Sequence, residues 1–338
     1  MVMNGTMSNS VNNNSHEVHV NVTSVEDNIQ YSLKIFQITI FSLVCFLGTI
    51  GNGLVIWFCL IRMEKTVNVI WFLNLAIADF TFAMSLPFIV TSMVLDYHWP
   101  FGDFMCRFIW FLFFLNMATS VLQLMVISLD RCVSVVFPVW CHNYRTRRLA
   151  LVVVLIIWVI SATLTLPSYI FRRTVGNDGI ACITYYGKTW VPMMRFILFF
   201  LVPFIIIISC YVTIVLRIKD KTIIKSSKPF RLIITVVTSF FVCWFPYHFS
   251  VLFGIYGTKN NFSKFGNPVS VDLMLFNSCI NPILYVFIGR DFKQKFCGSF
   301  QAMLEKAFTE DLDKTDFKKS QHRSYFRGSV ASKDNILM

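Results

Sequence analysis

The chain has 338 residues, of which 56% are hydrophobic and only 14% are charged. Soluble domains carry about 25% charged residues, so this composition excludes a soluble enzyme, a secreted disulfide scaffold and a disordered chain. It predicts an integral membrane protein, in which the net charge of +12 indicates basic cytoplasmic loops and no nucleic-acid partner.

The apolar stretches predict the fold class, because a helix that crosses a bilayer needs roughly 20 mostly apolar residues. Such stretches cover residues 35–60, 67–95, 106–136, 149–170, 191–217, 230–256 and 269–288. Helices are expected because lipid offers the backbone no hydrogen-bond partners. The sequence therefore predicts an all-α membrane protein with a seven-transmembrane helix bundle. Residues 1–34 would form an extracellular tail, residues 35–299 the bundle with a short amphipathic eighth helix, and residues 300–338 a cytoplasmic tail.

The basic residues predict the orientation of this bundle. Arg145, Arg147 and Arg148 follow the third stretch, and the segment 217–231 after the fifth stretch is also rich in Lys and Arg. Both segments lie on the same side of the membrane, which the positive-inside rule assigns to the cytoplasm. The N-terminus is then extracellular and the C-terminus cytoplasmic, in a multi-pass protein of the plasma membrane. Residues 1–10 lack a basic segment and an apolar core, so the first span is expected to direct insertion.

Two kinds of covalent feature fall on the extracellular side in this orientation. Glycosylation sequons begin at Asn4, Asn13, Asn21 and Asn261. Among the cysteines, only Cys106 and Cys182 lie outside, where oxidising conditions favour a disulfide between them. Such a bridge would hold the loop between the fourth and fifth spans over the mouth of the bundle.

Asp79 is an acid in the middle of the second span, where a charge costs roughly 2.5–3.5 kcal/mol and needs polar neighbours. The polar candidates in other spans are Asn52, Asn116, Ser120, Asn277, Ser278 and Asn281. Asn116 and Ser120 are four residues apart, as are Asn277 and Asn281, so each pair shares one helix face. The group is either a hydrogen-bond network that joins helices or a site for a monovalent cation on Asp79.

Other polar or helix-breaking residues lie in the third, sixth and seventh spans. Asp130 and Arg131 close the third span, where such a pair alone would be no more than interfacial charges. The sixth span contains Cys243-Trp244-Phe245-Pro246, and the seventh contains Asn281-Pro282-Ile283-Leu284-Tyr285. Proline inside a helix breaks the hydrogen-bond ladder and kinks it, so both spans are candidates for moving levers.

Together these motifs, with GNGLV and LNLAIAD in the first two spans, resemble the rhodopsin class of G protein-coupled receptors from about residue 35 to 299. Within that class the chain is similar to the formyl peptide receptor family of chemoattractant receptors. The strings that carry this resemblance are GNGLVIW, HWPFG, LDRCVSV, FPVW, IKSSKP, CWFPY, FNSCINPILYVFIG and LEKAFTED.

The resemblance implies roles for individual residues. The implied sodium pocket is formed by Asp79, Asn116, Ser120, Asn277 and Asn281, and the implied activation switch by Asp130, Arg131, Tyr211, Trp244, Pro246, Asn281, Pro282 and Tyr285. Arg131 would pair with Asp130 in the inactive state and meet Tyr211 and a heterotrimeric G protein in the active state. Ser226 stands where some receptors of the class carry an acid, so the inactive state should be held less tightly. Cys297, after the eighth helix, is a candidate palmitoylation site.

The ligand pocket departs from the pattern of the formyl peptide receptors. An Asp of the family, eight residues after the conserved cysteine, is replaced by Phe114, and of two family arginines in the fifth span only Arg195 remains. Arg195 is therefore expected to lack its partner, and either to bind a carboxylate or formyl oxygen of a peptide ligand or to reach the lipid headgroups. The expected lining around it is aromatic: Trp110, Phe113, Phe114, Phe199, Tyr247 and Phe253.

The predicted function is a receptor for peptides, possibly N-formylated, that signals through an inhibitory-type G protein and calcium and is not an enzyme. The alternative is a chemosensory, vomeronasal-type receptor that responds little to formyl-methionyl peptides. A retinal protein is excluded because residues 269–288 contain no Lys, and a transporter because no internal repeat is found. The spacing of His16 and His19 does not fit a zinc motif, so no metal site is expected. Arrestin, recruited by phosphorylation of the tail, and membrane lipid are further expected partners.

Overall fold

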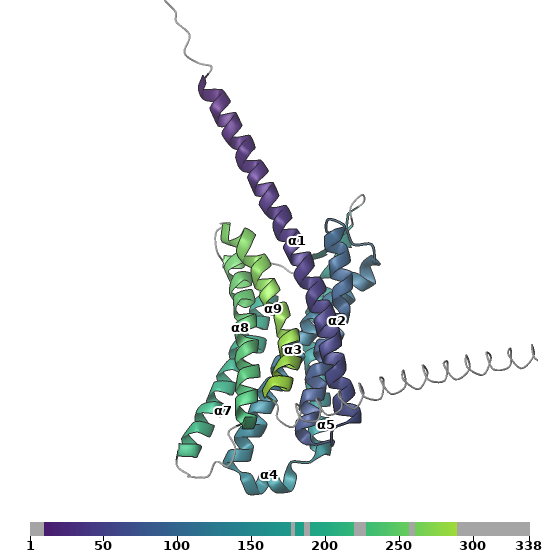
Figure 1. Ribbon diagram of the computed structural model, residues 1–338, viewed down its shortest axis with the longest axis vertical. Coiled ribbons are helices and arrows are strands. Elements are labelled where there is room, and N and C mark those ends of the chain that lie inside the picture. The colour runs from purple at the N-terminus through teal and green to yellow at the C-terminus, as the bar shows by residue number, and fades with distance from the viewer. Residues whose placement is uncertain (1–9, 177–179, 186–189, 220–227, 257–260, 289–338) are drawn as a thin grey trace, which may run out of the picture. The chain divides into compact units, whose positions relative to one another are not determined.

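The computed structural model describes residues 10–176, 180–185, 190–219, 228–256 and 261–288 (Figure 1). Its long helices are α1 (Ser10–Ile61), α2 (Val67–Val94), α3 (Gly102–Val136), α5 (Arg147–Ile170), α7 (Val202–Lys219), α8 (Lys228–Tyr256) and α9 (Asn261–Ile288). Shorter helices are α4 (Pro138–Tyr144), α6 (Trp190–Phe196) and the π-helical η1 (Ile197–Leu201), and α6, η1 and α7 follow one another in one span. Strands β1 (Arg172–Val175) and β2 (Ala181–Thr184) form an antiparallel hairpin.

Six helical segments of the described chain are long and apolar enough to cross a membrane: Asn28–Ile61, Val67–Val94, Gly102–Val136, Arg147–Ile170, Trp190–Arg217 and Ile233–Gly254. Helix α9 covers the remaining predicted span. The most apolar window is 72% buried in α3 but only 28% in α5, so α3 runs through the centre of the bundle and α5 along its outside. The exposed faces of the outer helices carry large apolar side chains such as Phe46, Leu155 and Leu216, as expected for contact with lipid.

Small residues of α1 let its neighbours approach closely. A Cβ atom on Gly48 would lie 3.1 Å from the Cβ of Ala83 in α2, and one on Gly51 would lie 3.2 Å from the ring of Pro282 in α9. Van der Waals packing of small residues is a main source of attraction between helices in lipid. Gly48 therefore lets α1 lie close to α2, and Gly51, the first residue of the GNGLV motif, lets it lie close to α9.

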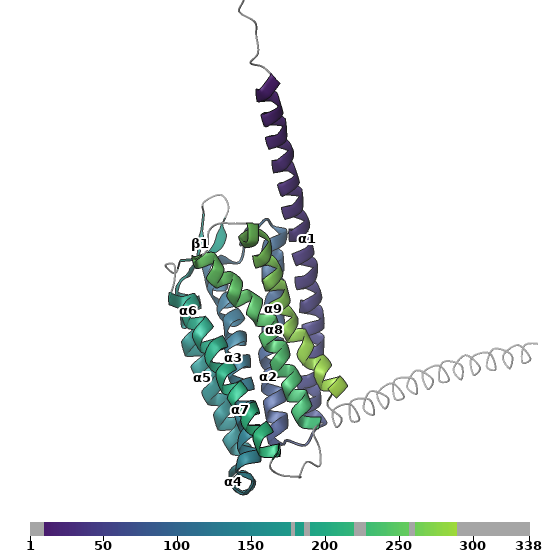
Figure 2. The ribbon, with the colours of Figure 1, turned by 90° about the vertical axis from the view of Figure 1, so that its left-hand side faces the viewer.

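The helix starts and turns follow from local sequence. The Thr66 and Thr146 hydroxyls accept backbone N–H bonds from Val69 and Leu149, so they cap the first turns of α2 and α5. Helix α1 begins at Ser10, earlier than the span predicted from residue 35, because no proline or glycine interrupts residues 10–47. Strand β1 and helix α4 lie at opposite ends of the bundle, which are the extracellular and cytoplasmic ends in the predicted orientation (Figure 2).

Candidate functional site

The extracellular loop is fastened to the outer end of α3. Cys106 in α3 and Cys182 in β2 form the predicted disulfide. A second attachment comes from Asp103, whose carboxylate accepts a hydrogen bond from the backbone N–H of Thr174 in β1 at 2.9 Å and pairs with Arg107 at 2.6 Å. The hairpin is thus held at both strands, and its position over the bundle is fixed relative to α3.

Next to this attachment, α3 presents three of the predicted lining residues as one aromatic cluster. The ring of Phe113 lies 5.1 Å from that of Trp110 and 5.2 Å from that of Phe114. Phe113 and Phe114 are buried, and Trp110 is half-buried. Trp110 and Phe114 are one helical turn apart, so they share a face of α3. The guanidinium of Arg172 in β1 lies 3.7 Å from the ring centre of Trp110.

Arg195 lies deep in the bundle, with only 4% of its surface exposed. Its guanidinium donates a hydrogen bond to the hydroxyl of Ser168 in α5 at 2.6 Å and lies 3.5 Å from the ring centre of Phe114. The expectation that Arg195 lacks a partner is therefore wrong. The face of an aromatic ring attracts a cation, so Phe114 is a second partner of Arg195. Because the side chain is buried, it does not reach the headgroups.

The remaining predicted lining residues, Phe199, Tyr247 and Phe253, do not all face the interior of the bundle. Phe199 is fully buried in η1, and a π-helical turn of this kind is frequent at functional sites. The ring of Tyr247 meets that of Trp244 edge-on at 5.8 Å. Phe253 stacks at 6.0 Å on Phe249, whose ring is exposed, so this pair follows the outward side of α8.

Sequence reasoning missed His248 in α8. It is buried, and its ring lies 5.2 Å from that of Phe200 and 6.3 Å from that of Trp244. Its Nε2 atom has no hydrogen-bond partner among the described residues. The available signal was a polar residue four positions after Trp244 in an apolar span, which places both on one helix face.

Sequence reasoning also missed Asp272 in α9. The side chain is 5% exposed, and neither carboxylate oxygen has a hydrogen-bond partner by distance and angle among the described residues. Gln37 of α1, which donates a bond to the backbone carbonyl of Pro268, comes near this carboxylate. A second buried acid therefore lies in the seventh span, and the polar positions of the bundle are not limited to the surroundings of Asp79.

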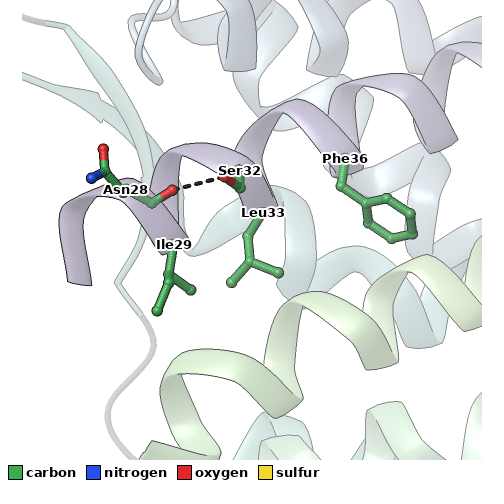
Figure 3. Close-up of a pocket in the computed structure, with 5 residues that line it drawn as sticks. All are labelled: Asn28, Ile29, Ser32, Leu33 and Phe36. Atoms are coloured by element: carbon green, nitrogen blue, oxygen red, sulfur yellow. Dashed lines mark hydrogen bonds between the residues drawn. The ribbon is translucent and has the colours of Figure 1, made fainter. Parts of the chain in front are cut away.

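A hollow of about 480 Å³ lies outside this region, along the outer part of α1 (Figure 3). It is lined by Asn28, Ile29, Ser32, Leu33 and Phe36, all from one helix, and the Ser32 hydroxyl in it donates to the carbonyl of Asn28. A depression along a single helix does not bring converging groups onto a ligand. It contains none of the predicted site residues, so we do not assign ligand recognition to it.

Asp79 is completely buried and accepts three hydrogen bonds. They come from Asn116 at 3.1 Å, Ser278 at 3.1 Å and Asn281 at 2.8 Å. Donors from α3 and α9 therefore meet the carboxylate that α2 carries. Ser120 and Asn277 are buried as well but donate no described bond to Asp79. Of the polar residues predicted around Asp79, four have a side-chain oxygen without a hydrogen-bond partner among the described residues: Asn52, Ser120, Asn277 and Asn281.

The predicted lever residues occupy the interior of α8 and α9. Trp244 is buried, and its ring stacks on that of Phe240 at 5.8 Å. Pro246 lies inside α8 and Pro282 inside α9, as expected for kinked spans. Tyr211 is half-buried in α7. The side chain of Tyr285 lies outside the described residues.

At the cytoplasmic end of α3, Asp130 has two basic partners. The guanidinium of Arg131 lies 3.4 Å from its carboxylate, but Arg145 from the following loop makes closer contacts at 2.7 and 3.0 Å. Asn68 in α2 accepts hydrogen bonds from both arginines. Arg145 and Asn68 were not predicted as site residues. Arg145 competes for Asp130, so the predicted pair of Asp130 and Arg131 is only part of the contact.

The sequence was compared with models of protein families to find the family of this helix bundle. The model of the 7 transmembrane receptor (rhodopsin family) matches residues 51–285. The chain belongs to the rhodopsin family of seven-transmembrane receptors. The predicted fold, the plasma-membrane location and the prediction that the chain is not an enzyme are confirmed by this membership. The chain is thus a G protein-coupled receptor with an extracellular N-terminus and a cytoplasmic C-terminus.

Receptors of three kinds are similar to this chain. It is 42% identical to human chemerin-like receptor 1, over 84% of this chain and 83% of that receptor. It is 38% identical to formyl peptide receptor 2 of Mus musculus, over 89% of this chain and 94% of that receptor. The C3a anaphylatoxin chemotactic receptor of Oncorhynchus mykiss is 39% identical, over 87% of this chain and 84% of its own length. The similarity therefore does not single out the formyl peptide receptors.

The shared carboxylate of Asp130 gives a prediction for agonist-free signalling of this receptor. Asp130→Asn should raise basal activity roughly threefold to tenfold, because it releases Arg131 for the active-state role that the family resemblance implies. Arg145→Ala should lower it, because Arg131 then becomes the sole basic partner of Asp130 among the described contacts. The measurement is basal nucleotide exchange on the G protein at matched surface expression. Arg62→Ala, at the exposed end of α1, is the control. A rise with both Asp130→Asn and Arg145→Ala would contradict the competition.

Several predicted sites lie outside the described part of the chain. These are Asn4, Ser226, Cys297 and the start of the eighth helix at Gly289. The side chains of Asn13, Asn21 and Asn261 are not described either, although their backbones lie in α1 and α9. Glycosylation, palmitoylation and the boundaries of both tails therefore stay predictions from the sequence.

Proposed function

We propose that this receptor senses peptides that carry an anionic terminus, and that it signals through an inhibitory-type G protein and calcium. The observation that carries the proposal is the buried Arg195, which lies beside the aromatic cluster of Trp110, Phe113 and Phe114. A guanidinium held in an apolar environment forms strong, directional bonds to a carboxylate or formyl oxygen. The aromatic rings suit the hydrophobic side chains of such a peptide. A peptide ligand is further supported by a relative that is named as a formyl peptide receptor.

A ligand screen tests the proposal. Cells that express the full chain would be exposed to three groups of peptides: formylated peptides, the same peptides without the formyl group, and versions with an amidated C-terminus. Calcium release is the readout, and pertussis toxin tests the type of G protein. We expect responses that depend on an anionic or formyl terminus and disappear with the toxin. Equal potency of an unformylated, amidated peptide and of its free-acid and formylated versions would contradict the proposed role of Arg195.

We also propose that the surroundings of Asp79 hold a sodium ion that favours the inactive state. The side-chain oxygens of Asn52, Ser120, Asn277 and Asn281, which have no partner among the described residues, belong to carboxamide and hydroxyl groups, and oxygen ligands of this kind suit hard cations. A buried carboxylate also gains from a counter-charge. Asp79, Asn116, Ser120, Asn277 and Asn281 would hold the ion. The three hydrogen bonds that Asp79 already accepts give these residues a structural role even without it.

The sodium proposal predicts a salt-specific effect on agonist binding. In the unmodified receptor, replacing choline chloride with sodium chloride should weaken agonist binding roughly fivefold or more. Asp79→Asn should remove this difference, because a neutral amide does not attract the cation. The measurement is competition binding at constant ionic strength. Ser161→Ala, which alters a buried hydroxyl in α5, is the control. Equal affinities in the two salts for the unmodified receptor would exclude the ion.

A further proposal concerns the C-terminal tail and the way in which signalling ends. We propose that phosphorylation of Thr309, Thr315, Ser320, Ser324, Ser329 and Ser332 recruits arrestin, since each phosphate adds about −1.5 to −2 charges. Replacing all six residues with alanine should prolong signalling and slow internalisation of the receptor. Fluorescence measurement of arrestin recruitment after agonist addition checks this, with alanine at Ser32, Ser42 and Thr39 of α1 as the control. Unchanged recruitment in the tail variant would exclude these sites.

A further inference from the structure

A cavity of about 180 Å³ lies at the cytoplasmic end of the bundle, between α2, α3, α4 and α5. Most of its lining is apolar, and its charged part is formed by Asp130 and Arg145. The apolar lining residues include Val67, Trp71, Leu129, Val133, Leu149 and Ala150. Helix α4, which contributes Trp140, lies at the end of the bundle in Figure 1, so the cavity is near the cytoplasmic surface of the membrane. The proposed ligand and sodium sites do not include it.

The size and the lining of the cavity restrict what it holds. Pockets for drug-sized molecules measure about 300–1,000 Å³, so this cavity has room for part of a molecule and not for a folded peptide. The indole N–H of Trp71, a residue with 4% of its surface exposed, has no acceptor among the described residues. A buried donor without an acceptor is destabilising. A bound molecule should therefore combine a narrow apolar segment with a hydrogen-bond acceptor.

The charge beside the cavity is positive. Asp130 is already neutralised by Arg145 at 2.7 Å. Arg147 and Arg148 are exposed on the first turn of α5, directly before the lining residues Leu149 and Ala150. Neither of these arginines forms an ion pair with another residue in the described ranges. Basic groups near the cytoplasmic leaflet attract anionic lipid headgroups.

We propose that this cavity binds an anionic phospholipid of the cytoplasmic leaflet. The first part of one acyl chain fills the cavity. The indole N–H of Trp71 donates a hydrogen bond to an ester carbonyl of the lipid, and the phosphate contacts Arg147 and Arg148. Because Asp130 and Arg145 line the same cavity, the bound lipid touches the ion pair that competes with Arg131. The lipid thus stabilises the contact between the loop after α3 and the rest of the bundle.

The test uses the full receptor in nanodiscs of phosphatidylcholine that contain a small fraction of a photoreactive lipid with a diazirine in its acyl chain. The probe is either phosphatidylserine or phosphatidylcholine, and the labelled residues are located by mass spectrometry. We expect the serine lipid to label residues 126–153 several-fold more than the choline lipid. Equal labelling by the two probes would overturn the choice of an anionic lipid.

Two pairs of variants separate the site from general attraction to the membrane surface. Arg147→Gln/Arg148→Gln should reduce phosphatidylserine labelling several-fold, to about the level of the choline probe. Arg62→Gln/Lys65→Gln removes the same charge from the exposed turn between α1 and α2 and should change it little. Equal losses with both charge variants would show surface attraction only and overturn the proposal.

The second pair addresses the cavity itself. Ala150→Phe fills the space and should reduce labelling at least as strongly, whereas Ala162→Phe, on the same helix outside the lining, should not. Thermal melting identifies a variant that fails to fold. The charge variants are exposed and do not depend on core packing, so they decide the question in that case. Unchanged labelling in a folded Ala150→Phe receptor would also overturn the proposal.

Discussion

Cys106→Ser is expected to lower both surface expression and agonist response at least tenfold. The bridge to Cys182 closes a separation of 76 residues, and loss of a native disulfide typically costs about 2–5 kcal/mol. Strand β2 would lose its covalent link to α3, and the hairpin would no longer be held over the aromatic cluster. Flow cytometry of an epitope-tagged receptor and calcium dose–response curves measure the two effects.

Matched variants make this result specific. Cys182→Ser should have the same effect as Cys106→Ser, and the double variant should add nothing, because either change alone breaks the bridge. Cys45→Ser, which changes a half-buried thiol in α1, should leave expression normal. Asp103→Ala removes the second attachment, to Thr174, and should cause a smaller loss of potency. Additive losses in the double variant would contradict the pairing of the two cysteines.

The spans could be predicted because a bilayer requires long apolar segments, whose ends are marked by charges and caps. The predicted span 149–170 corresponds to α5, Arg147–Ile170, which begins where Thr146 caps the helix. The start of α1 could not be predicted in this way. Hydropathy detects the part of a helix that lies in lipid, and α1 continues through the polar residues 10–27, which hydropathy assigns to a tail.

The surroundings of Asp79 could be predicted because a buried acid needs donors and helical spacing shows which residues share a face. Asn116 and Asn281 were found by that rule, and both donate to Asp79. The contact of Arg145 with Asp130 was missed because the path of the connecting loop, and not helical spacing, brings them together. The partners of Arg195 were missed for a related reason, since Ser168 comes from another helix and the attraction of a ring for a cation leaves no motif in the sequence.

Arg195→Ala is expected to reduce the potency of agonists that carry a carboxylate or formyl group roughly tenfold to hundredfold. A hydrogen bond to a charged group contributes about 1.5–3 kcal/mol, and a buried anion without its cation would also be destabilised. The same change should have little effect on an amidated agonist. Calcium dose–response curves for each peptide pair measure the difference. Arg173→Ala, in β1 and exposed, is the matched control for loss of one arginine. Unchanged potency for every agonist would exclude Arg195 from the ligand site.

Phe114→Asp tests why this pocket differs from that of the formyl peptide receptors. The Arg195 guanidinium lies 3.5 Å from the ring centre of Phe114, so a carboxylate at position 114 would be within reach of Arg195. It would also supply an acceptor for the N–H of a formamide group. We therefore expect Phe114→Asp to raise sensitivity to formylated over unformylated peptides, whereas Phe114→Leu, which removes the ring without adding a charge, should not. Arg195 would orient the new carboxylate, so Phe114→Asp/Arg195→Ala should lose the gain, and the double-mutant cycle measures this coupling. If the gain persists without Arg195, the two side chains do not act on the ligand together.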